Sequence, residues 1–376
     1  MATPEFCPND LCPYHHGAHA EVKWYRKAGC YSTEAFGEVQ RYRCLTCGRY
    51  FSDQTFALDY YVKRPVSYRQ VFERVTGGGG LRGIGRNLSV GHQAVTNRIG
   101  RLARQAIALH AELMQLLSLE EDLVTDGFES FVGDKYMPNN IHTLVGSRSQ
   151  FLYAFDYAHL RRKGQMTDRQ KAERERREEQ YVREPNGIIA SFTRIVDEIE
   201  QLLHGRAEES KFVLKSDEKP EYLPPIKGSE VLQELASREL FEHQRTNSEE
   251  PRTKQNPLFP VNYLDKQIRK DNANHVRETV QFSRDVNNCL ERLSVYQLFH
   301  NYIKPYRIEG DEKLLRHGQV AGIPRRLIDR ELEGIFRLRK FYSHVKLSFS
   351  QLLLWARMVG NVDRHSGGYW PKYVWM

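Results

Sequence analysis

The feature that most constrains this chain is a set of two cysteine pairs near its start. Cys7 and Cys12 are separated by four residues, and Cys44 and Cys47 flank a Cys-x-x-Cys-Gly turn within RYRCLTCGRYFS. Zn²⁺ prefers four soft ligands in a tetrahedron, and two close pairs brought together by hairpins supply them. The spacing therefore predicts a zinc ribbon over residues 1–62, a small module whose folding depends on the metal.

Two other interpretations of this module stay open. A redox-active Cys-x-x-Cys motif is one of them, although no βαβ pattern surrounds the second pair. The nearby histidines His15, His16 and His19 offer ring nitrogens that can replace a cysteine ligand. Cys30 lies between the two pairs and is expected to be a spare thiol. Clustering of five cysteines in the first 47 residues favours a metal site over disulfides in a reducing compartment.

Composition adds a modest indication about the partner. The chain of 376 residues is long enough for two or three domains, and its formal net charge is +8 with a pI of about 9.0. This balance favours a polyanion, although many ordinary soluble proteins are equally basic. The chain has no apolar run of membrane-spanning length and no apolar signal-peptide stretch at its start. We therefore expect a cytoplasmic protein with no membrane partner.

A helix-turn-helix pattern occupies residues 63–118. Apolar residues at helical spacing mark a short helix over residues 81–88 and a second helix from about residue 92, with Ser89-Val90-Gly91 as the turn. The second helix continues to about Leu117, which indicates a linker or a dimerising arm. Many such helical hairpins bind nothing, and DNA binding is the alternative that we favour. Its contacts are expected near the start of the second helix, at His92, Gln93, Thr96, Asn97 and Arg98.

Two short apolar runs farther along the chain each lead to an aspartate. Leu123 and Val124 precede Asp126 in EDLVTDGFESF, and residues 212–214 precede Asp217 in KFVLKSDEKPEY. We interpret both runs as buried strands that deliver a carboxylate at their exit. A plain turn after the first strand is the alternative interpretation of the Asp-Gly pair.

The segments between these two aspartates predict how the strands are arranged. Residues 120–160 hold three apolar or alternating runs separated by turn residues, which predicts an antiparallel three-stranded meander. An amphipathic helix over residues 188–203 then separates the meander from the second aspartate strand. That strand can therefore pair in parallel with the first one and set Asp126 beside Asp217.

Two segments of this chain have a weaker relation to that core. A mixed-charge run near residues 159–187 has hardly any apolar residues and predicts a solvated helical insertion. Its basic start can lie on a DNA backbone through Arg161, Arg162 and Lys163. Residues 306–376 are expected to form a helical C-terminal extension, and the pattern indicates no function for it.

The order of these elements resembles that of bacterial insertion-sequence transposases with a DDE/D catalytic core, especially the small type that joins a zinc ribbon to a helix-turn-helix. The resemblance covers roughly residues 5–305. Its clearest marks are CPNDLC with YRCLTCGRYFS, VTDGFESF, FVLKSDEKPEY and NYLDKQIRKDNANHVRETVQFSRD. It implies a multi-domain α/β protein with a zinc ribbon, a helical helix-turn-helix domain, an RNase H-like α/β core with a mixed sheet over residues 119–305, and a helical tail.

The resemblance also implies a catalytic site. Asp126 and Asp217 would be two of three acids that hold two Mg²⁺ or Mn²⁺ ions for DNA strand cleavage and transfer. The family's glutamate falls on Asn262 and its asparagine on Asp265, so the third acid is displaced by one helical turn. Residues three apart share a helix face, which makes Asp265 the expected third acid and Glu278 a less favoured substitute.

The implied partner is double-stranded DNA, both the terminal inverted repeats of an element and its target, bound by a dimer or a higher homo-oligomer in the nucleoid region of a bacterium. Arg269 and Arg277 of the last stretch are further expected DNA contacts. Two alternatives stand beside an active transposase. A catalytically decayed, domesticated transposase would act as a DNA-binding protein or transcriptional regulator. A zinc-bearing regulator with an unrelated C-terminal domain would have no carboxylate cluster.

Overall fold

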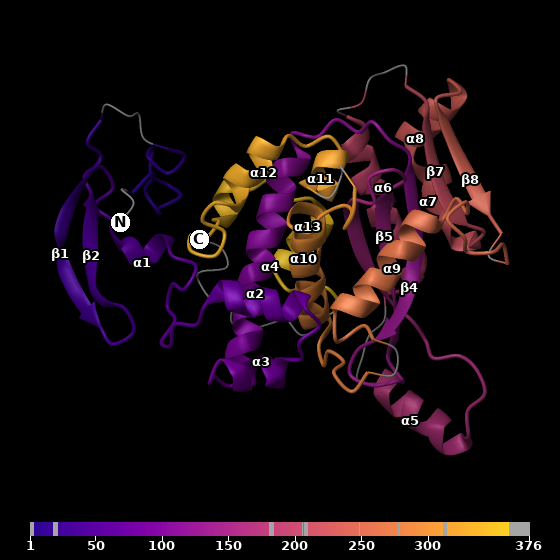
Figure 1. Ribbon diagram of the computed structural model, residues 1–376, viewed down its shortest axis with the longest axis horizontal. Helices are drawn as coiled ribbons and strands as arrows, with labels where there is room; N and C mark the ends of the chain where they lie inside the picture. The colour runs from indigo at the N-terminus through magenta and orange to yellow at the C-terminus, as the bar shows by residue number, and fades with distance from the viewer. Residues whose placement is uncertain are drawn as a thin grey trace.

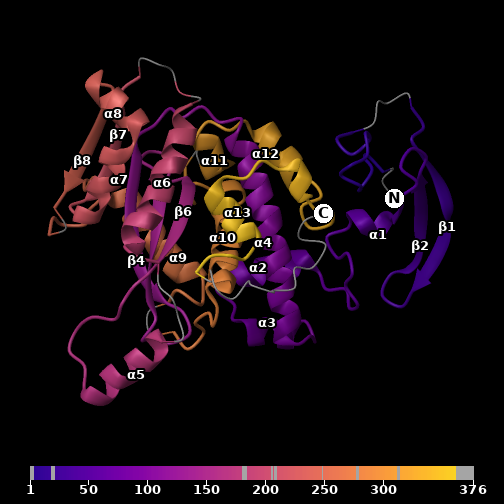
Figure 2. The same cartoon turned by 180° about the vertical axis from the view of Figure 1, so that it is seen from behind.

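The computed structural model describes residues 4–17, 22–179, 184–204, 206, 210–247, 249–276, 279–310 and 314–360. Within these residues the chain is a mixed α/β protein with two sheets, one of three strands and one of five (Figure 1). The small sheet lies at one end of the molecule, and the large sheet lies at the other, with most of the helices between them (Figures 1 and 2).

The amino-terminal module is built on three antiparallel strands in the order β1-β2-β3, followed by a single helical turn, α1. Its small core combines the cysteines with three stacked or edge-on aromatic rings, Trp24, Tyr42 and Phe51. So few apolar residues cannot hold a domain of this size unaided, and the cysteines supply the remaining constraint. The elements are β1 (Tyr25–Thr33), β2 (Gly37–Cys44), β3 (Tyr50–Ser52) and α1 (Asp53–Phe56).

The helix-turn-helix pattern forms as expected, with α2 before it, but its last helix is not a free arm. The turn at Ser89 takes a positive φ of 54° and joins the two helices of the motif. From Val95 to Leu113 the last helix is buried almost all round in the middle of the molecule, because α2, α3 and α10 and two helices of the carboxyl-terminal extension pack against it. The expectation of a linker or dimerising arm is therefore wrong. The helices are α2 (Tyr68–Thr76), α3 (Leu81–Asn87), α4 (His92–Met114) and α10 (Val286–Tyr302).

The five-stranded sheet has the order β6-β5-β4-β7-β8. The expected antiparallel meander is confirmed in β4, β5 and β6, and the strand bearing Asp217 pairs in parallel with β4. A further parallel strand, β8, was not expected, because its sequence FEHQRT is polar and buries only its first and last side chains at the sheet edge. The strands are β4 (Leu123–Phe131), β5 (Pro138–Gly146), β6 (Leu152–His159), β7 (Phe212–Asp217) and β8 (Phe241–Thr246).

Helices cover both faces of this sheet. On one face α6 packs against β5 and β6, and its apolar stripe joins a core that continues to α4 and α2. On the other face α9 lies against β4 and β5 and forms a second core with α10. Figures 1 and 2 show α9 and α6 from opposite sides of the sheet. Helices of this layer are α6 (Gly187–Leu203), α7 (Leu223–Gly228), α8 (Glu230–Ser237) and α9 (Phe259–Asp271), with a 3₁₀ turn at Pro220–Tyr222.

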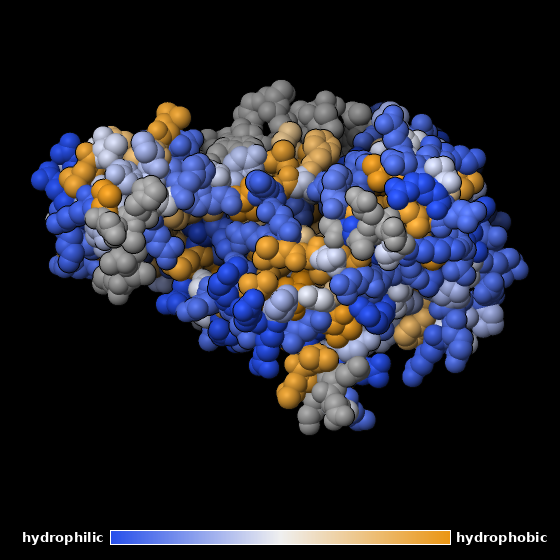
Figure 3. Space-filling model, turned by 90° about the horizontal axis from the view of Figure 1, so that it is seen from above, coloured by the Kyte–Doolittle hydropathy of each residue, from blue (hydrophilic) through white to orange (hydrophobic). Residues whose placement is uncertain are grey.

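The charged insertion forms the expected solvated helix, α5 (Asp168–Glu178), which buries none of its residues. It projects from the end of the sheet, away from the other helices (Figures 1 and 2). Seen from above, hydrophilic residues dominate both ends of the molecule, and hydrophobic residues gather near the middle (Figure 3). No helix among the described residues is both long and apolar enough to cross a bilayer.

The carboxyl-terminal extension returns across the molecule and joins its two ends. Leu338 forms a β-bridge with Ala57, and the Leu58 amide donates a 2.7 Å hydrogen bond to the Arg337 carbonyl. Phe341 packs edge-on against Phe6 at 5.0 Å between ring centroids. We call residues 335–344 the strap, because they hold the amino-terminal module against the body. The extension contains α11 (His317–Val320), α12 (Arg325–Leu332), η3 (Tyr342–His344) and α13 (Phe349–Trp355).

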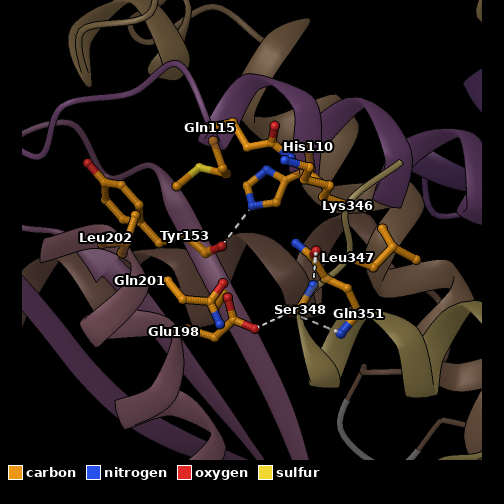
Figure 4. A pocket seen from close by; sticks show the side chains of 13 residues that line it. His110, Gln115, Tyr153, Glu198, Gln201, Leu202, Lys346, Leu347, Ser348 and Gln351 are labelled. Atoms are coloured by element: carbon orange, nitrogen blue, oxygen red, sulfur yellow. Dashed lines mark hydrogen bonds between the residues drawn. The ribbon is translucent and has the colours of Figure 1, made fainter. Parts of the chain in front are cut away.

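A cavity of about 340 Å³ lies where the end of this extension crosses α4, β6 and α6 (Figure 4). Ser348, the N-cap of α13, donates a hydrogen bond to the Glu198 carboxylate across this cavity, and His110 binds the Tyr153 carbonyl on its far side. Burial raises the pKa of Glu198 to about 7, and the neighbouring Asp156 adds to the rise, although the Ser348 hydroxyl opposes it.

We expect Glu198→Gln to be more stable than the wild type at pH 8 by about 1–3 kcal/mol and equally stable near pH 4. The folded-state pKa of Glu198 exceeds its unfolded value of about 4.5, so the folded protein binds more protons and loses stability as the pH rises from about 4.5 to 7. Urea unfolding at several pH values measures this. Glu200→Gln on the same helix is the control, and an unchanged pH slope in Glu198→Gln contradicts the prediction.

Candidate active site and metal centres

The parallel pairing of β4 with β7 sets two aspartates on one face of the sheet. The register pairs Leu123 with Leu214 and Val124 with Lys215, and Asp126 and Asp217 each follow two residues later. Side chains alternate along a strand, so Asp126 shares the face of Val124, which belongs to the core under α9. Asp217 likewise lies on the face opposite to Leu214, whose side chain packs on the α6 side. Both carboxylates therefore face α9.

The sequence predicts Asp126 at the exit of its strand. The structure instead places it in the middle of β4. β4 continues through Gly127 to Phe131 and stays paired with β5 over its whole length. Gly127 is required here, because a Cβ at this position would overlap the side-chain amide of Asn140 on β5. The backbone amide of Gly127 donates a 2.7 Å hydrogen bond to Oδ1 of Asp126 and orients that carboxylate.

Helix α9 brings a third carboxylate over the same face. Its apolar residues Val261, Leu264 and Ile268 pack on the sheet, and Asp265 lies between them at helical spacing. Oδ1 of Asp265 is shielded from solvent and has no hydrogen-bond partner among the described residues. Asn262, one turn earlier, is buried as well. The structure thus gathers Asp126, Asp217 and Asp265 at one site, whereas Glu278 lies outside the described residues.

Burial and a neighbouring negative charge disfavour the ionised forms of Asp126 and Asp265. Burial raises the pKa of Asp126, and the negative charge of Asp217 raises it further. Burial also raises the pKa of Asp265 to about 8, with the charge of Asp126 as the next cause. Such a group of acids either holds a proton or binds a cation. An unpartnered buried oxygen and a set of hard oxygen donors fit a divalent ion such as Mg²⁺.

The carboxylates of the three aspartates do not form one close ligand set for a single ion. Among the described residues, four cysteines and three histidines form sets whose ligand atoms all lie within 4.8 Å of one another, and the three aspartates form no such set. Two ions about 4 Å apart allow carboxylates to stand farther from each other, because each outer acid holds only one ion.

Two basic residues that the sequence reasoning missed approach the same site. The positive charges of Lys219 and Arg252 lower the pKa of Asp126, and Arg252 also acts on Asp265. Arg252 is exposed, and Lys219 follows Asp217 by two residues. Cations beside a carboxylate cluster are suited to hold a phosphate. The close sequence neighbourhood of Asp217 was the available signal for Lys219, whereas the loop bearing Arg252 gave none.

The cysteine pairs converge in the amino-terminal module as expected. The Sγ atoms of Cys7 and Cys47 are 3.6 Å apart, and those of Cys12 and Cys44 are 3.8 Å apart. All four sulfurs lie within 4.8 Å of one another, and three of the four residues are buried. Such a group can hold a metal ion such as zinc. Cys30 is exposed on β1, outside the group, and His19 lies outside the described residues.

The helix-turn-helix residues divide into two groups. His92, Gln93 and Asn97 are exposed at the start of α4, and Thr96 is half-buried with its hydroxyl bound to the His92 carbonyl. Arg98 is buried and donates a 2.8 Å hydrogen bond to the Arg64 carbonyl. The expectation that Arg98 contacts DNA is therefore corrected: its side chain fastens α4 to the preceding segment.

The other basic residues expected at DNA also have internal contacts. Arg161 pairs with Glu178 of α5 at 3.1 Å, Arg162 stacks on the Tyr136 ring, and Lys163 is exposed. Arg269 donates hydrogen bonds to the carbonyls of Glu129 and His275, which ties α9 to the end of β4 and favours a positioning role. Arg277 lies outside the described residues.

Comparison with known proteins adds no identification. No protein-family model matches the chain, and no curated protein matches it in sequence.

We expect Asp265→Asn to stabilise the metal-free protein at pH 8 by about 1–2 kcal/mol and to leave it unchanged near pH 4. The folded-state pKa of Asp265, about 8, exceeds its unfolded value of 3.8, so wild-type stability falls as the pH rises through this window. Excess Mg²⁺ is expected to stabilise the wild type at pH 8 but not the variant. Urea unfolding with and without chelator measures both effects.

The exposed Asp168 of α5 provides the matched control, since Asp168→Asn changes the same charge far from the site. Equal destabilisation of Asp265→Asn at both pH values, with an unchanged response to Mg²⁺, would contradict a carboxylate cluster.

We expect Cys44→Ser to lose the tightly bound zinc of the amino-terminal module and to make β1–β3 sensitive to protease, because four thiolates supply most of the binding. Cys30→Ser removes an exposed cysteine of the same module that lies outside the group, and it is expected to change neither property. Zinc content by elemental analysis and the protease cleavage pattern are the measurements. Retention of zinc by Cys44→Ser shows that the cysteines do not bind it.

Proposed function

We propose that this protein is a DNA transposase with an RNase H-like core, which cleaves and transfers DNA strands through a carboxylate triad. The observation that carries the proposal is the arrangement of Asp126, Asp217 and Asp265 under α9, with the pKa values of Asp126 and Asp265 raised by burial and by the charge of a neighbouring aspartate. Buried carboxylates with raised pKa values are typical of metal-dependent phosphoryl transfer sites.

The order and direction of the elements support the same proposal. A meander, a helix, a strand parallel to the first strand and an acid-bearing helix follow one another in β4, β5, β6, α6, β7 and α9. A cysteine module and a helix-turn-helix precede them, as in the family that the motifs resemble. The exposed polar start of α4 and the net charge of +8 suit double-stranded DNA as the substrate.

The residues of the site have separable roles in this chemistry. Bound Mg²⁺ would activate the attacking water or 3′-hydroxyl and neutralise the charge of the leaving oxygen. Asp126, central in the sheet and flanked by the other two acids, would contact both ions, and Asp217 and Asp265 one each. Lys219 and Arg252 would hold the phosphate backbone beside them. Asp265 is one methylene shorter than the family's glutamate, so α9 has to lie close to the sheet, as it does.

We expect the purified protein to nick double-stranded DNA taken from either side of its coding sequence in the presence of Mg²⁺, and Asp126→Ala to be at least 10³-fold slower. Gel assays of nicking and strand transfer measure the rates. The control is Glu129→Gln, which neutralises an exposed acid on the same strand and is expected to keep the wild-type rate.

An inert wild type that still binds these fragments would favour the second candidate, a DNA-binding protein that has lost catalysis. The buried Asn262 in the family's glutamate position is the observation that favours this candidate. A wild type and an Asp126→Ala variant with equal activity would refute the carboxylate mechanism.

A further inference from the structure

Three histidines meet where the amino-terminal module contacts the strap. His15 and His16 follow the first cysteine pair, and His344 ends η3 in the strap. Their ring nitrogens lie within 4.8 Å of one another. The ring centroids of His15 and His344 are 4.5 Å apart, and those of His16 and His344 are 5.5 Å apart. From this geometry we propose a second metal site, a three-histidine centre that binds a divalent transition ion, Zn²⁺ above all.

The hydrogen bonds of His15 leave the right atom for a ligand. Its Nδ1 lies 2.7 Å from the Cys7 carbonyl oxygen, which can only accept, so Nδ1 carries the proton and Nε2 is the unprotonated nitrogen. Nε2 accepts a hydrogen bond from the Ser343 hydroxyl, which a bound ion would displace. A metal-binding histidine characteristically donates its other N–H to a carbonyl or a carboxylate in this way, which fixes the tautomer and the ring orientation.

The surroundings suit an ion that enters from solvent and is held against an apolar wall. His15 is buried, whereas His16 and His344 are exposed and leave a route of access. Phe6 packs on His15 and His344, and Phe341 packs on His344. Each pair of nitrogens has to close by at most about 1.5 Å to reach the spacing of tetrahedral Zn–N ligation.

The proposed site is chemically distinct from the cysteine group. Four thiolates carry negative charge and favour soft ions, whereas three neutral imidazoles carry none and also accept Ni²⁺ or Cu²⁺. The histidine site should therefore bind Zn²⁺ more weakly than the cysteine site, by at least tenfold. Its ligands come from both ends of the chain, so the bound ion cross-links the amino-terminal module to the strap.

Metal titration of the full-length protein tests the proposal. With excess Mg²⁺ present to occupy the carboxylate site, we expect the wild type to bind two equivalents of Zn²⁺ per chain, of which a mild chelator removes one. His344→Ala is expected to bind one equivalent. In a Co²⁺ titration, thiolate charge-transfer absorption should saturate at the first equivalent, while the second adds only ligand-field bands. The second equivalent should also raise the Tm of the wild type by about 2–4 °C and leave that of His344→Ala unchanged.

Two further variants keep the test decisive. His16→Ala removes an exposed ligand from the other end of the chain and should also bind one equivalent. His204→Ala removes an exposed histidine at the end of α6 and should keep two. A wild type that saturates at one equivalent overturns the proposal. So does a His344→Ala variant that retains both equivalents, since the three rings would then be a packing contact only.

Discussion

The parallel pairing of β4 with β7 is the contact on which the rest of the candidate active site depends. Without it, Asp126 and Asp217 belong to strands 91 residues apart in sequence and have no reason to meet. A parallel pair needs a crossover, and α6 supplies it while covering one face of the sheet. The opposite face is left to α9, which carries Asp265. One strand pairing thus fixes both which acids meet and which helix covers them.

The placing of these aspartates together under α9 lowers the stability of the folded protein unless a cation is bound. Burying Asp126 and Asp265 beside another carboxylate costs free energy through desolvation and repulsion, and the raised pKa values of both report that cost. The positive charges of Lys219 and Arg252 offset part of this free-energy cost. Within the part of the chain described here, neither residue forms an ion pair that would occupy these carboxylates. A stable protein that only needed a core would place apolar residues at these positions.

Much of this arrangement could be predicted from sequence, because the apolar runs of the meander and the amphipathic pattern of α6 are strong local signals. The failures have equally local causes. Arg98 stands three residues after Val95 and four before Leu102, so helical spacing already assigned it to the buried face. The small residues of α4 allow α2, α10, α12 and α13 to pack around it, which a one-sided apolar stripe does not express. The polar edge strand β8 has almost no alternation to detect.

The strap has a consequence for the order in which the molecule is completed. Ala57 and Leu338 are partners about 280 residues apart, so during synthesis the amino-terminal module cannot dock on the strap until the residues between them have been added. At 5–20 residues per second this interval is roughly 15–60 s. During it, Phe6 and Phe56, which contact Phe341 in the finished protein, have no strap to cover them. A nascent chain that stalls before residue 335 therefore presents an aromatic surface that chaperones and aggregation compete for.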